Sequence, residues 1–285
     1  MLYYYAHTGH KIGLDRLRRA AAVIKRLAGE GIECRLLLND FRAGLAARDL
    51  GIKEYVTIET IQDIDAVAAR GDSVIIDSDE DEHGRLVKYC SDFTHVWRFE
   101  HDADDRSIHG ETLFRADCRE EDCLNAVIVD DAYFDIEEKE ERMLFFLQDM
   151  DHDKTILSHA PFFEAFPMEL LLGNYFFVKY EELLAQCFCA LYEPEEYMDL
   201  IKSSSTVITA SAQTALEASA AGAKVIYIDI QQVSLYPAVL LERYGIDCMK
   251  GFDAEVLKHL LKQNSDKTKK PVEKFDLNHL ISVYK

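Results

Sequence analysis

Positive charge is scarce in this sequence, and the scarcity limits the partners that the protein can bind. The 285 residues contain 32 Lys and Arg against 52 Asp and Glu, which gives a formal net charge of −20. Nucleic-acid binding depends on basic side chains that neutralise phosphates, so no nucleic-acid partner is predicted. The same charge argues against binding to an anionic membrane surface.

Long apolar runs are missing as well. No uninterrupted hydrophobic stretch approaches the ~20 residues that a membrane helix requires, so no membrane insertion is predicted. Residues 1–7 lack a basic segment followed by an apolar one, and so do not resemble a signal peptide. The seven cysteines form no CxxC pair, and we interpret them as free thiols in a reducing compartment. Together these features predict a cytoplasmic protein.

Strand-like runs alternate with helical patterns through the first third of the chain. Strands are expected at residues 2–6, 33–38, 55–58, 73–77 and 94–99, and helices at 14–28, 40–49, 62–70 and 83–91. Alternation at this spacing predicts right-handed βαβ units and a parallel sheet. The pattern loosens and becomes acidic over residues 100–141, which indicates a solvated face or a linker.

A second series of the same kind follows the linker. Its strands are expected at residues 143–148, 175–179, 188–192, 206–210 and 224–229, and its helices at 181–186, 195–203, 213–221, 234–244, 254–263 and 276–283. The predicted fold class is α/β, with two Rossmann-like domains, 1–138 and 139–285, facing a cleft. The C-terminal tail is expected to cross back onto the first domain. Open parallel sheets usually bind their ligands in such crevices.

The strongest local signal is the segment 205–229, which reads as strand, turn, helix and strand. Ser211 and Thr214 place hydroxyl groups at the start of the helix, where backbone N–H groups suit a phosphate. Glu217, one turn further on, could accept hydrogen bonds from ribose hydroxyls. The alternative is that Ser211 only caps the helix and that Glu217 is a solvated residue.

Residues 205–250 resemble the C-terminal domain of the GT-B nucleotide-sugar enzymes. They are especially similar to the nucleotide-sugar hydrolase of pseudaminic acid biosynthesis and to related predicted glycosyltransferases. Where that family reads ISASS…NEAL, ICY and NQ, this chain has ITASAQTALE at 208–217, VIY at 225–227 and a glutamine pair. The resemblance implies a GT-B fold with a bound nucleotide sugar. It places the nucleotide on Ser211, Gln213, Thr214 and Glu217, and the sugar near Gln231 and Gln232.

At the N-terminus the family carries a turn of the form G-x-G-H-x-x-R. Gly13 and Arg19 match this turn, but Arg16 stands where the family has its histidine. A guanidinium cannot take up a proton, but its paired donors suit a phosphate or carboxylate. The resemblance therefore places Gly13, Arg16 and Arg19 at the phosphates. The catalytic base then has to be His10, which could equally be a surface residue, or Asp79.

Two further stretches depart from the family pattern. An acidic run, residues 77–83, stands where the family has an aromatic hydroxyl, and residues 148–153 (QDMDHD) replace a glycine-rich phosphate loop. Carboxylates in such a loop repel phosphates. These stretches could hold magnesium or manganese, or they could be solvated loops, and we predict no metal site and no cofactor.

The function predicted from this resemblance is hydrolysis of a nucleotide-diphosphate sugar. A glycosyltransferase that uses a carboxylate as its base is the first alternative. A non-catalytic GT-B partner protein in surface-glycan or flagellar-glycan synthesis is the second, because three signature groups are altered. The predicted ligand is a nucleotide sugar, and the oligomeric state is left open.

Overall fold

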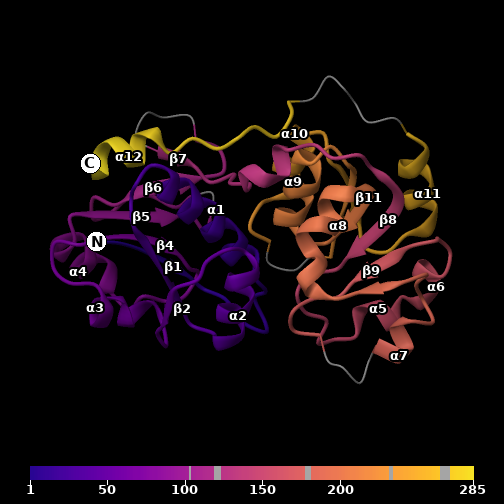
Figure 1. The fold of residues 1–285 in the computed structure, drawn as a ribbon, viewed down its shortest axis with the longest axis horizontal. Coiled ribbons are helices and arrows are strands. Elements are labelled where there is room, and N and C mark those ends of the chain that lie inside the picture. The colour runs from indigo at the N-terminus through magenta and orange to yellow at the C-terminus, as the bar shows by residue number, and fades with distance from the viewer. Residues whose placement is uncertain (103, 119–122, 177–180, 231–233, 264–269) are drawn as a thin grey trace. The chain divides into compact units, whose positions relative to one another are not determined.

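The computed structural model describes residues 1–102, 104–118, 123–176, 181–230, 234–263 and 270–285. It divides into two compact units (Figure 1). Unit 1 comprises Met1–Asp130 and Lys274–Lys285, and unit 2 comprises Asp131–Glu273. Each unit is built around a parallel sheet of its own, which confirms the predicted α/β class with two Rossmann-like halves.

The sheet of unit 1 has the order β3-β2-β1-β4-β5-β6-β7 among the described residues. Its strands are β1 (Leu2–Ala6), β2 (Cys34–Leu38), β3 (Tyr55–Thr57), β4 (Ser73–Asp77), β5 (His95–Phe99), β6 (Thr112–Arg115) and β7 (Cys123–Asn125). Its helices are α1 (Asp15–Gly29), α2 (Phe41–Asp49), α3 (Ile64–Val67), α4 (Arg85–Asp92) and α12 (Asn278–Tyr284), with a 3₁₀ turn at Ile61–Asp63.

Strand β1 is buried on both faces, which explains its continuous apolar sequence. Tyr3 and Tyr5 point into a cluster that also contains Tyr89 of α4. Tyr4 points to the opposite face, where its ring lies 6.2 Å from that of Phe99. Because successive side chains of a strand point to opposite faces of the sheet, β1 contributes to the hydrophobic layer on each face.

The C-terminal segment completes unit 1. The Arg26 guanidinium lies 4.7 Å from the centre of the Phe275 ring and donates a 3.2 Å hydrogen bond to the Phe275 carbonyl oxygen. Leu280 is fully buried, and Lys285 lies 3.8 Å from the Glu30 carboxylate. Helix α12, yellow in Figure 1, is thus packed in the unit that contains the N-terminus.

The sheet of unit 2 has the order β10-β9-β8-β11-β12-β13 among the described residues. Its strands are β8 (Glu140–Phe146), β9 (Glu169–Leu171), β10 (Leu191–Tyr192), β11 (Ser204–Thr209), β12 (Lys224–Asp229) and β13 (Asp247–Lys250). Its helices are α5 (Thr155–Ser158), α6 (Ala160–Phe163), α7 (Glu181–Leu184), α8 (Tyr197–Ser203), α9 (Ala212–Ala220), α10 (Ala238–Arg243) and α11 (Ala254–Lys262), with 3₁₀ turns at Asp131–Phe134 and Pro194–Glu196.

Two consecutive phenylalanines of β8 show how unit 2 is layered. Phe145 joins a cluster with Phe163 of α6 and Leu257 of α11 on one face of the sheet. Phe146 points to the other face, where its ring meets that of Tyr197 of α8 edge to face at 5.3 Å. Helices therefore cover both faces of this sheet, as in doubly wound folds.

Several expected elements differ from the structure. The stretch 100–141 is not only a linker, because it contains β6 and β7. A strand expected at 175–179 is not found at Tyr175 and Phe176, and its remaining residues lie outside the described ones. The strand that pairs with β8 in that region is β9, which begins at Glu169, and β13 was not expected at all. These strands have three or four residues, too few for a clear hydrophobic period.

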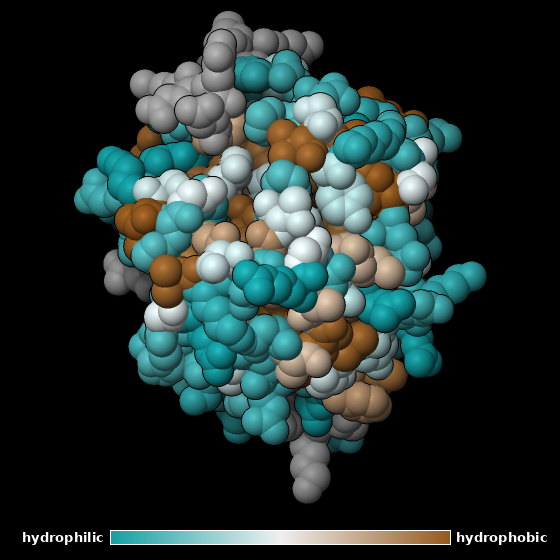
Figure 2. Space-filling view, turned by 90° about the vertical axis from the view of Figure 1, so that its left-hand side faces the viewer, coloured by the Kyte–Doolittle hydropathy of each residue, from teal (hydrophilic) through white to brown (hydrophobic). Residues whose placement is uncertain are grey.

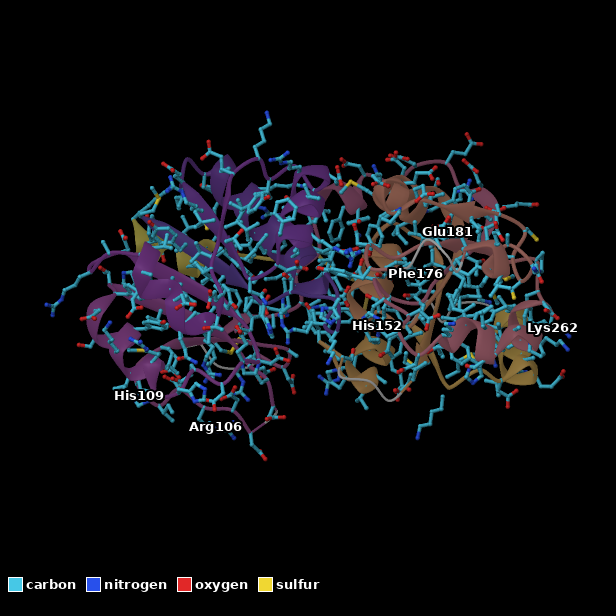
Figure 3. The ribbon with its side chains drawn as sticks, turned by 90° about the horizontal axis from the view of Figure 1, so that it is seen from below. Arg106, His109, His152, Phe176, Glu181 and Lys262 are labelled. Atoms are coloured by element: carbon cyan, nitrogen blue, oxygen red, sulfur yellow. A yellow bond between two sulfur atoms is a disulfide. The ribbon has the colours of Figure 1, made fainter. Side chains whose placement is uncertain are left out.

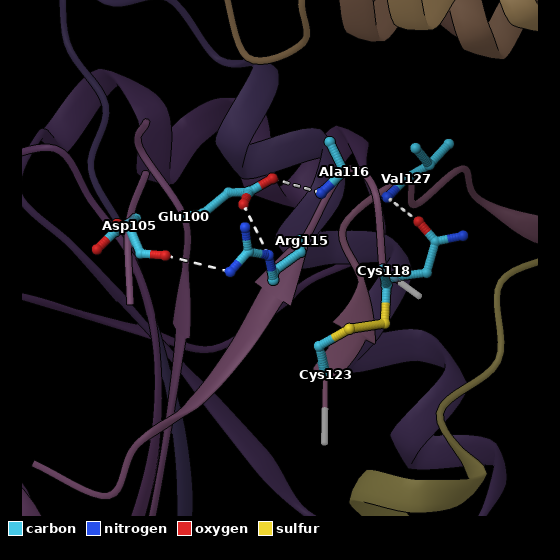
Figure 4. Close-up of a disulfide and its surroundings, with 8 residues drawn as sticks. Glu100, Asp105, Arg115, Ala116, Cys118, Cys123 and Val127 are labelled. Carbon is cyan, nitrogen blue, oxygen red and sulfur yellow. Dashed lines mark hydrogen bonds and ion pairs between the residues drawn. A yellow bond between two sulfur atoms is a disulfide. The ribbon is translucent and has the colours of Figure 1, made fainter. Parts of the chain in front are cut away.

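The expectation that all cysteines are free thiols is wrong for one pair. Cys118 and Cys123 form a disulfide, with their Cα atoms 5.8 Å apart (Figure 4). Cys118 follows β6 and Cys123 begins β7, which pairs with β6 in parallel, so the disulfide joins residues on either side of the connection between these strands. The remaining cysteines, Cys34, Cys90, Cys187, Cys189 and Cys248, form no disulfide in the part of the chain that the structure describes.

The surface is mixed in character. On the face shown in Figure 2, hydrophobic residues form separate patches between hydrophilic ones. Scattered apolar side chains of this kind are normal for a protein surface. Within the described ranges, no helix has the length and apolar character needed to cross a membrane.

Candidate functional site

The order of the strands singles out one edge of each sheet. In unit 1, β1 lies between β2 and β4, so the chain crosses over in opposite directions on either side of β1. In unit 2, β8 takes the same position between β9 and β11. Ligands of doubly wound folds bind at the carboxyl ends of the strands at such a switch point. The residues after β1, β4, β8 and β11 are therefore the candidates for function.

A histidine and an aspartate meet at the switch point of unit 1. His7 follows β1, and its Nδ1 lies 2.7 Å from Oδ1 of Asp79, which follows β4. The hydrogen bond from His7, together with the nearby Arg16 guanidinium, lowers the pKa of Asp79 well below its usual range. Asp79 is thus held as a carboxylate that orients His7, and a carboxylate of such low basicity is a poor proton acceptor.

A second carboxylate faces the other nitrogen of His7. Oε1 of Glu80 lies 3.9 Å from His7 Nε2. Its Oε2 accepts hydrogen bonds from the Tyr5 hydroxyl, from Ser78 Oγ at 2.8 Å and from the Ile61 N–H at 3.2 Å. Burial and the hydrogen bond to Glu80 both raise the pKa of Tyr5, so Tyr5 remains a donor. These three donors keep Glu80 in place beside the imidazole.

Beneath this pair lies a buried ion pair that fixes the start of α1. Arg19 donates from Nε and from one Nη to Asp77, at 2.8 and 2.6 Å, and its guanidinium lies 3.8 Å from the centre of the Phe99 ring. The Tyr4 hydroxyl donates to the same carboxylate at 3.0 Å. Arg19 and Asp77 are 3% and 1% exposed. The side chain predicted to reach a phosphate is therefore engaged with a carboxylate of its own unit.

Arg16 bridges the two aspartates that follow or end β4. Its Nε lies 3.5 Å from Asp77 and its Nη2 lies 3.1 Å from Asp79. Its side chain is 9% exposed, whereas that of Asp79 is 37% exposed. The Arg16 guanidinium therefore binds two carboxylates, a role that its paired donors suit. It lies closer to the surface than the ion pair of Arg19 and Asp77.

The predicted base His10 lies on a tight turn between β1 and α1. The N–H groups of Ile12 and Gly13 both donate to the Gly9 carbonyl oxygen, at 2.9 and 2.8 Å. Gly13 has φ = 83°, a left-handed conformation that favours glycine, and it closes the turn before α1. His10 is exposed on this turn. Gly13 thus has a conformational reason to be glycine apart from any ligand.

In unit 2, the predicted phosphate site is the start of α9 at the end of β11. Ser211 is the N-cap, and its Oγ accepts hydrogen bonds from the Thr214 N–H at 3.0 Å and from the Thr214 hydroxyl at 2.9 Å. The Gln148 side chain, after β8, donates to the Ala210 carbonyl oxygen at 3.1 Å. The switch point of unit 2 and the start of α9 therefore coincide, as the sequence pattern requires.

Glu217 lies in a buried polar network on α9. It is 2% exposed and accepts hydrogen bonds from the Tyr197 hydroxyl at 2.7 Å and from the Gln213 side chain at 2.9 Å. The Tyr236 hydroxyl donates to Gln213 at 3.3 Å. Glu217 is therefore a buried, hydrogen-bonded residue of α9 rather than a solvated one. Gln231 and Gln232, predicted near the sugar, lie outside the described residues.

The acidic loop after β8 has a structural explanation. Asp151 accepts hydrogen bonds from the Thr155 and Ile156 N–H groups at the start of α5, at 2.6 and 3.2 Å. Asp149 is 1% exposed, and the chain passes it so closely that a Cβ on Gly173 would lie 2.4 Å from its backbone carbon. His152, labelled in Figure 3, is exposed on the same loop. Asp151 therefore caps the start of α5, and Asp149 is packed inside the loop. These structural roles account for the two carboxylates without a bound cation.

Across the described ranges, no group of three or more His, Cys, Asp or Glu side chains is arranged to hold a metal ion. His109 is exposed on the loop before β6 (Figure 3).

With this geometry in place, comparison with solved structures classifies the fold. The UDP-GlcNAc 2-epimerase of Methanocaldococcus jannaschii, solved with UDP-GlcNAc and UDP, superposes with a TM-score of 0.63 at 13% identity, covering 100% of this chain and 99% of that one. The fold is of the GT-B type. No protein-family model matches the chain, and no curated protein sequence matches it.

Two further structures are similar to the chain at comparable levels. MnaA of S. aureus, solved with UDP, gives a TM-score of 0.58 at 14% identity, covering 92% of this chain and 88% of that one. The glycosyltransferase SnogD of Streptomyces nogalater gives 0.52 at 14% identity, covering 92% and 90%. Identities this low establish the shared architecture, and chemistry has to be argued from the residues.

The histidine at the switch point was not among the candidates drawn from the sequence. The family's turn before α1 points to His10, so the resemblance gives no indication of His7. The available signal was its position immediately after a strand that reads as fully buried. Its partner Asp79 was a candidate, as a base, and the structure places it on His7.

Proposed function

We propose that the protein hydrolyses a nucleotide-diphosphate sugar and that His7 is the general base. The observation that carries this proposal is the 2.7 Å contact between His7 and Asp79 at the switch point of unit 1. An Nδ1–H that donates to Asp79 leaves the lone pair of the imidazole on Nε2. A carboxylate in this position also favours the charged imidazolium that forms when Nε2 takes up a proton.

In the proposed step, Nε2 of His7 removes a proton from a water molecule. The water oxygen attacks the anomeric carbon, and the bond from this carbon to the diphosphate oxygen breaks. The nucleoside diphosphate leaves with the electron pair of that bond. Asp79 and Glu80, on either side of the ring, stabilise the imidazolium until the proton is released.

We propose that the nucleotide binds at the start of α9 in unit 2. Ser211 and Thr214 would contact the phosphates through their hydroxyl groups and the helix N-terminus. Gln213 and Glu217 would contact the nucleoside, and Gln231 and Gln232 remain the predicted sugar ligands. Support comes from the position of α9 at the switch point and from the UDP and UDP-GlcNAc bound in structures of similar fold.

For the arginines, the contacts separate two proposed roles. Arg16 remains the proposed phosphate ligand of unit 1, because its guanidinium contacts the partly exposed Asp79. Arg19 is better explained as the structural partner of Asp77, since it is buried and donates twice to that carboxylate. Gly13 is proposed to shape the turn that leads into α1.

Release of nucleoside diphosphate in the absence of an acceptor tests the proposal. A panel of UDP-sugars is incubated with the protein, and free UDP is measured by chromatography. We expect His7→Ala to slow the release by at least ~100-fold, the usual contribution of a general base. His10→Ala is the control and should retain the wild-type rate.

Each contrary result has a distinct meaning. Release that needs an added acceptor would identify a glycosyltransferase, and UDP binding without any release would identify a non-catalytic partner protein. If His10→Ala abolishes release while His7→Ala does not, the base lies on the turn at residues 9–13.

Calorimetric titration locates the nucleotide. UDP, UDP-GlcNAc and CMP are titrated with and without magnesium into the wild type and into Ser211→Ala. We expect one nucleotide to bind and the variant to weaken it, whereas Ser158→Ala, an exposed serine at the end of α5, leaves binding unchanged. Equal binding by both variants would remove α9 from the proposal.

A further inference from the structure

Unit 1 carries a concave site away from the switch point. It is a groove of about 580 Å³ beside the edge strand β3. Its lining residues come from β2, the last turn of α2, and β3 with the loop before it: Arg35, Arg48, Lys53, Glu54, Tyr55 and Val56. Arg35 is near the amino end of β2, and Tyr55 begins β3, so the groove belongs to the opposite end of these strands from His7 and Asp79.

The groove is basic in a chain that is otherwise acidic. Three of its lining residues are cations and one is an anion, whereas the whole chain carries a net charge of −20. Within the part of the chain that the structure describes, Arg48 and Lys53 have no ion-pair partner. Arg35 lies 3.7 Å from Glu33, whose side chain is 69% exposed. Such an exposed pair contributes little and leaves the guanidinium open to a ligand.

One wall of the groove is held in place by the close packing of Tyr55 against Gly44. A Cβ added to Gly44 of α2 would lie 2.2 Å from Cζ of the Tyr55 ring and 2.5 Å from its hydroxyl oxygen. The ring therefore rests directly on the backbone of α2, which a larger residue at position 44 would prevent. Together with Val56, it contributes apolar surface to the lining of the groove. The volume falls within the range of small-molecule sites, about 300–1,000 Å³.

We propose that this groove binds a small anion that carries two or more phosphate or carboxylate groups. Two guanidinium groups offer paired donors that match the geometry of such groups, and the Lys53 ammonium adds a third cation. The acidic surroundings favour binding in the groove over the rest of the surface, because an anion is repelled by acidic patches and attracted where these cations meet.

Titration of pyrophosphate and of citrate into the full chain tests the proposal. The double variant Arg48→Gln/Lys53→Gln removes two cations from the groove. The control, Arg70→Gln/Lys285→Gln, removes the same charge from exposed positions of unit 1 elsewhere. We expect the dissociation constant of at least one anion to rise tenfold or more in the groove variant and less than twofold in the control. The tighter of the two anions identifies the group that the site prefers.

A positional measurement separates this groove from the α9 site. In amide NMR spectra, we expect pyrophosphate or citrate to shift the signals of Arg35, Tyr55 and Val56. The absence of binding, an equal loss in the groove and control variants, or shifts confined to the start of α9 would each overturn the proposal. None of these outcomes depends on whether the protein hydrolyses a nucleotide sugar.

Discussion

Replacing Asp77 by asparagine removes the negative charge that compensates a buried guanidinium in unit 1. Arg19 and Asp77 are 3% and 1% exposed, and hydrogen bonds of 2.8 and 2.6 Å join them. Removing one partner of a buried ion pair costs about 3–5 kcal/mol, because the other charge stays buried without compensation. Asparagine keeps one acceptor oxygen for Arg19, so we expect the lower end of this range, ~3 kcal/mol.

Urea unfolding followed by tryptophan fluorescence measures this loss in unit 1 alone. Trp97 is the single tryptophan of the chain, lies on β5 and is 1% exposed. With a slope of about 2 kcal/mol per molar urea, ~3 kcal/mol lowers the unfolding midpoint by about 1.5 M. Asp49→Asn, on the exposed side of α2, is the control and should shift the midpoint by less than ~0.3 M. A shift for Asp77→Asn no larger than that of the control would refute the reasoning.

Two further predictions concern unit 1. Gly44→Ala should lower its stability by about 1–3 kcal/mol because the new methyl group meets the Tyr55 ring, whereas Gly29→Ala, with no atom within 4 Å of the added Cβ, should not lower it. Equal midpoints of thermal unfolding for Gly44→Ala and Gly29→Ala would contradict the close contact between Gly44 and the Tyr55 ring. The pKa of Asp79 is lowered by its hydrogen bond from His7, so its pairing stabilises the folded state above the ordinary carboxyl pKa and is lost as the pH falls. The difference in midpoint between the wild type and Asp79→Asn should therefore shrink as the pH falls from about 5 toward 2, and a constant difference would contradict the pairing.

The central strands could be predicted from the sequence because burial on both faces leaves a continuous apolar run. The expected bounds of β1, β4 and β12 coincide with those observed, Leu2–Ala6, Ser73–Asp77 and Lys224–Asp229. Short edge strands carry no such signal. Strand β7 consists of Cys123–Asn125 and follows an acidic stretch, so its pairing depends on tertiary contacts rather than on its own composition.

The candidate site, too, could be predicted only where its residues are consecutive in the chain. The start of α9 was predictable because Ser211, the helix and the following strand are consecutive in the chain. The pairing of His7 with Asp79 joins residues 72 positions apart. It becomes visible only when the strand order places β4 beside β1. Likewise, nothing in the sequence near Arg19 indicates that Asp77, rather than a phosphate, is its partner.

The packing of residues 274–285 in unit 1 has a consequence for the order of folding during synthesis. The chain leaves unit 1 at Asp130, builds unit 2 from one continuous segment, and only then supplies Phe275 and Leu280 to unit 1. Because a ribosome releases a chain from its N-terminus onward, unit 2 has all its residues available before unit 1 does. The half of the protein that emerges first is therefore completed last, and until then the surface that later receives Phe275 stays uncovered.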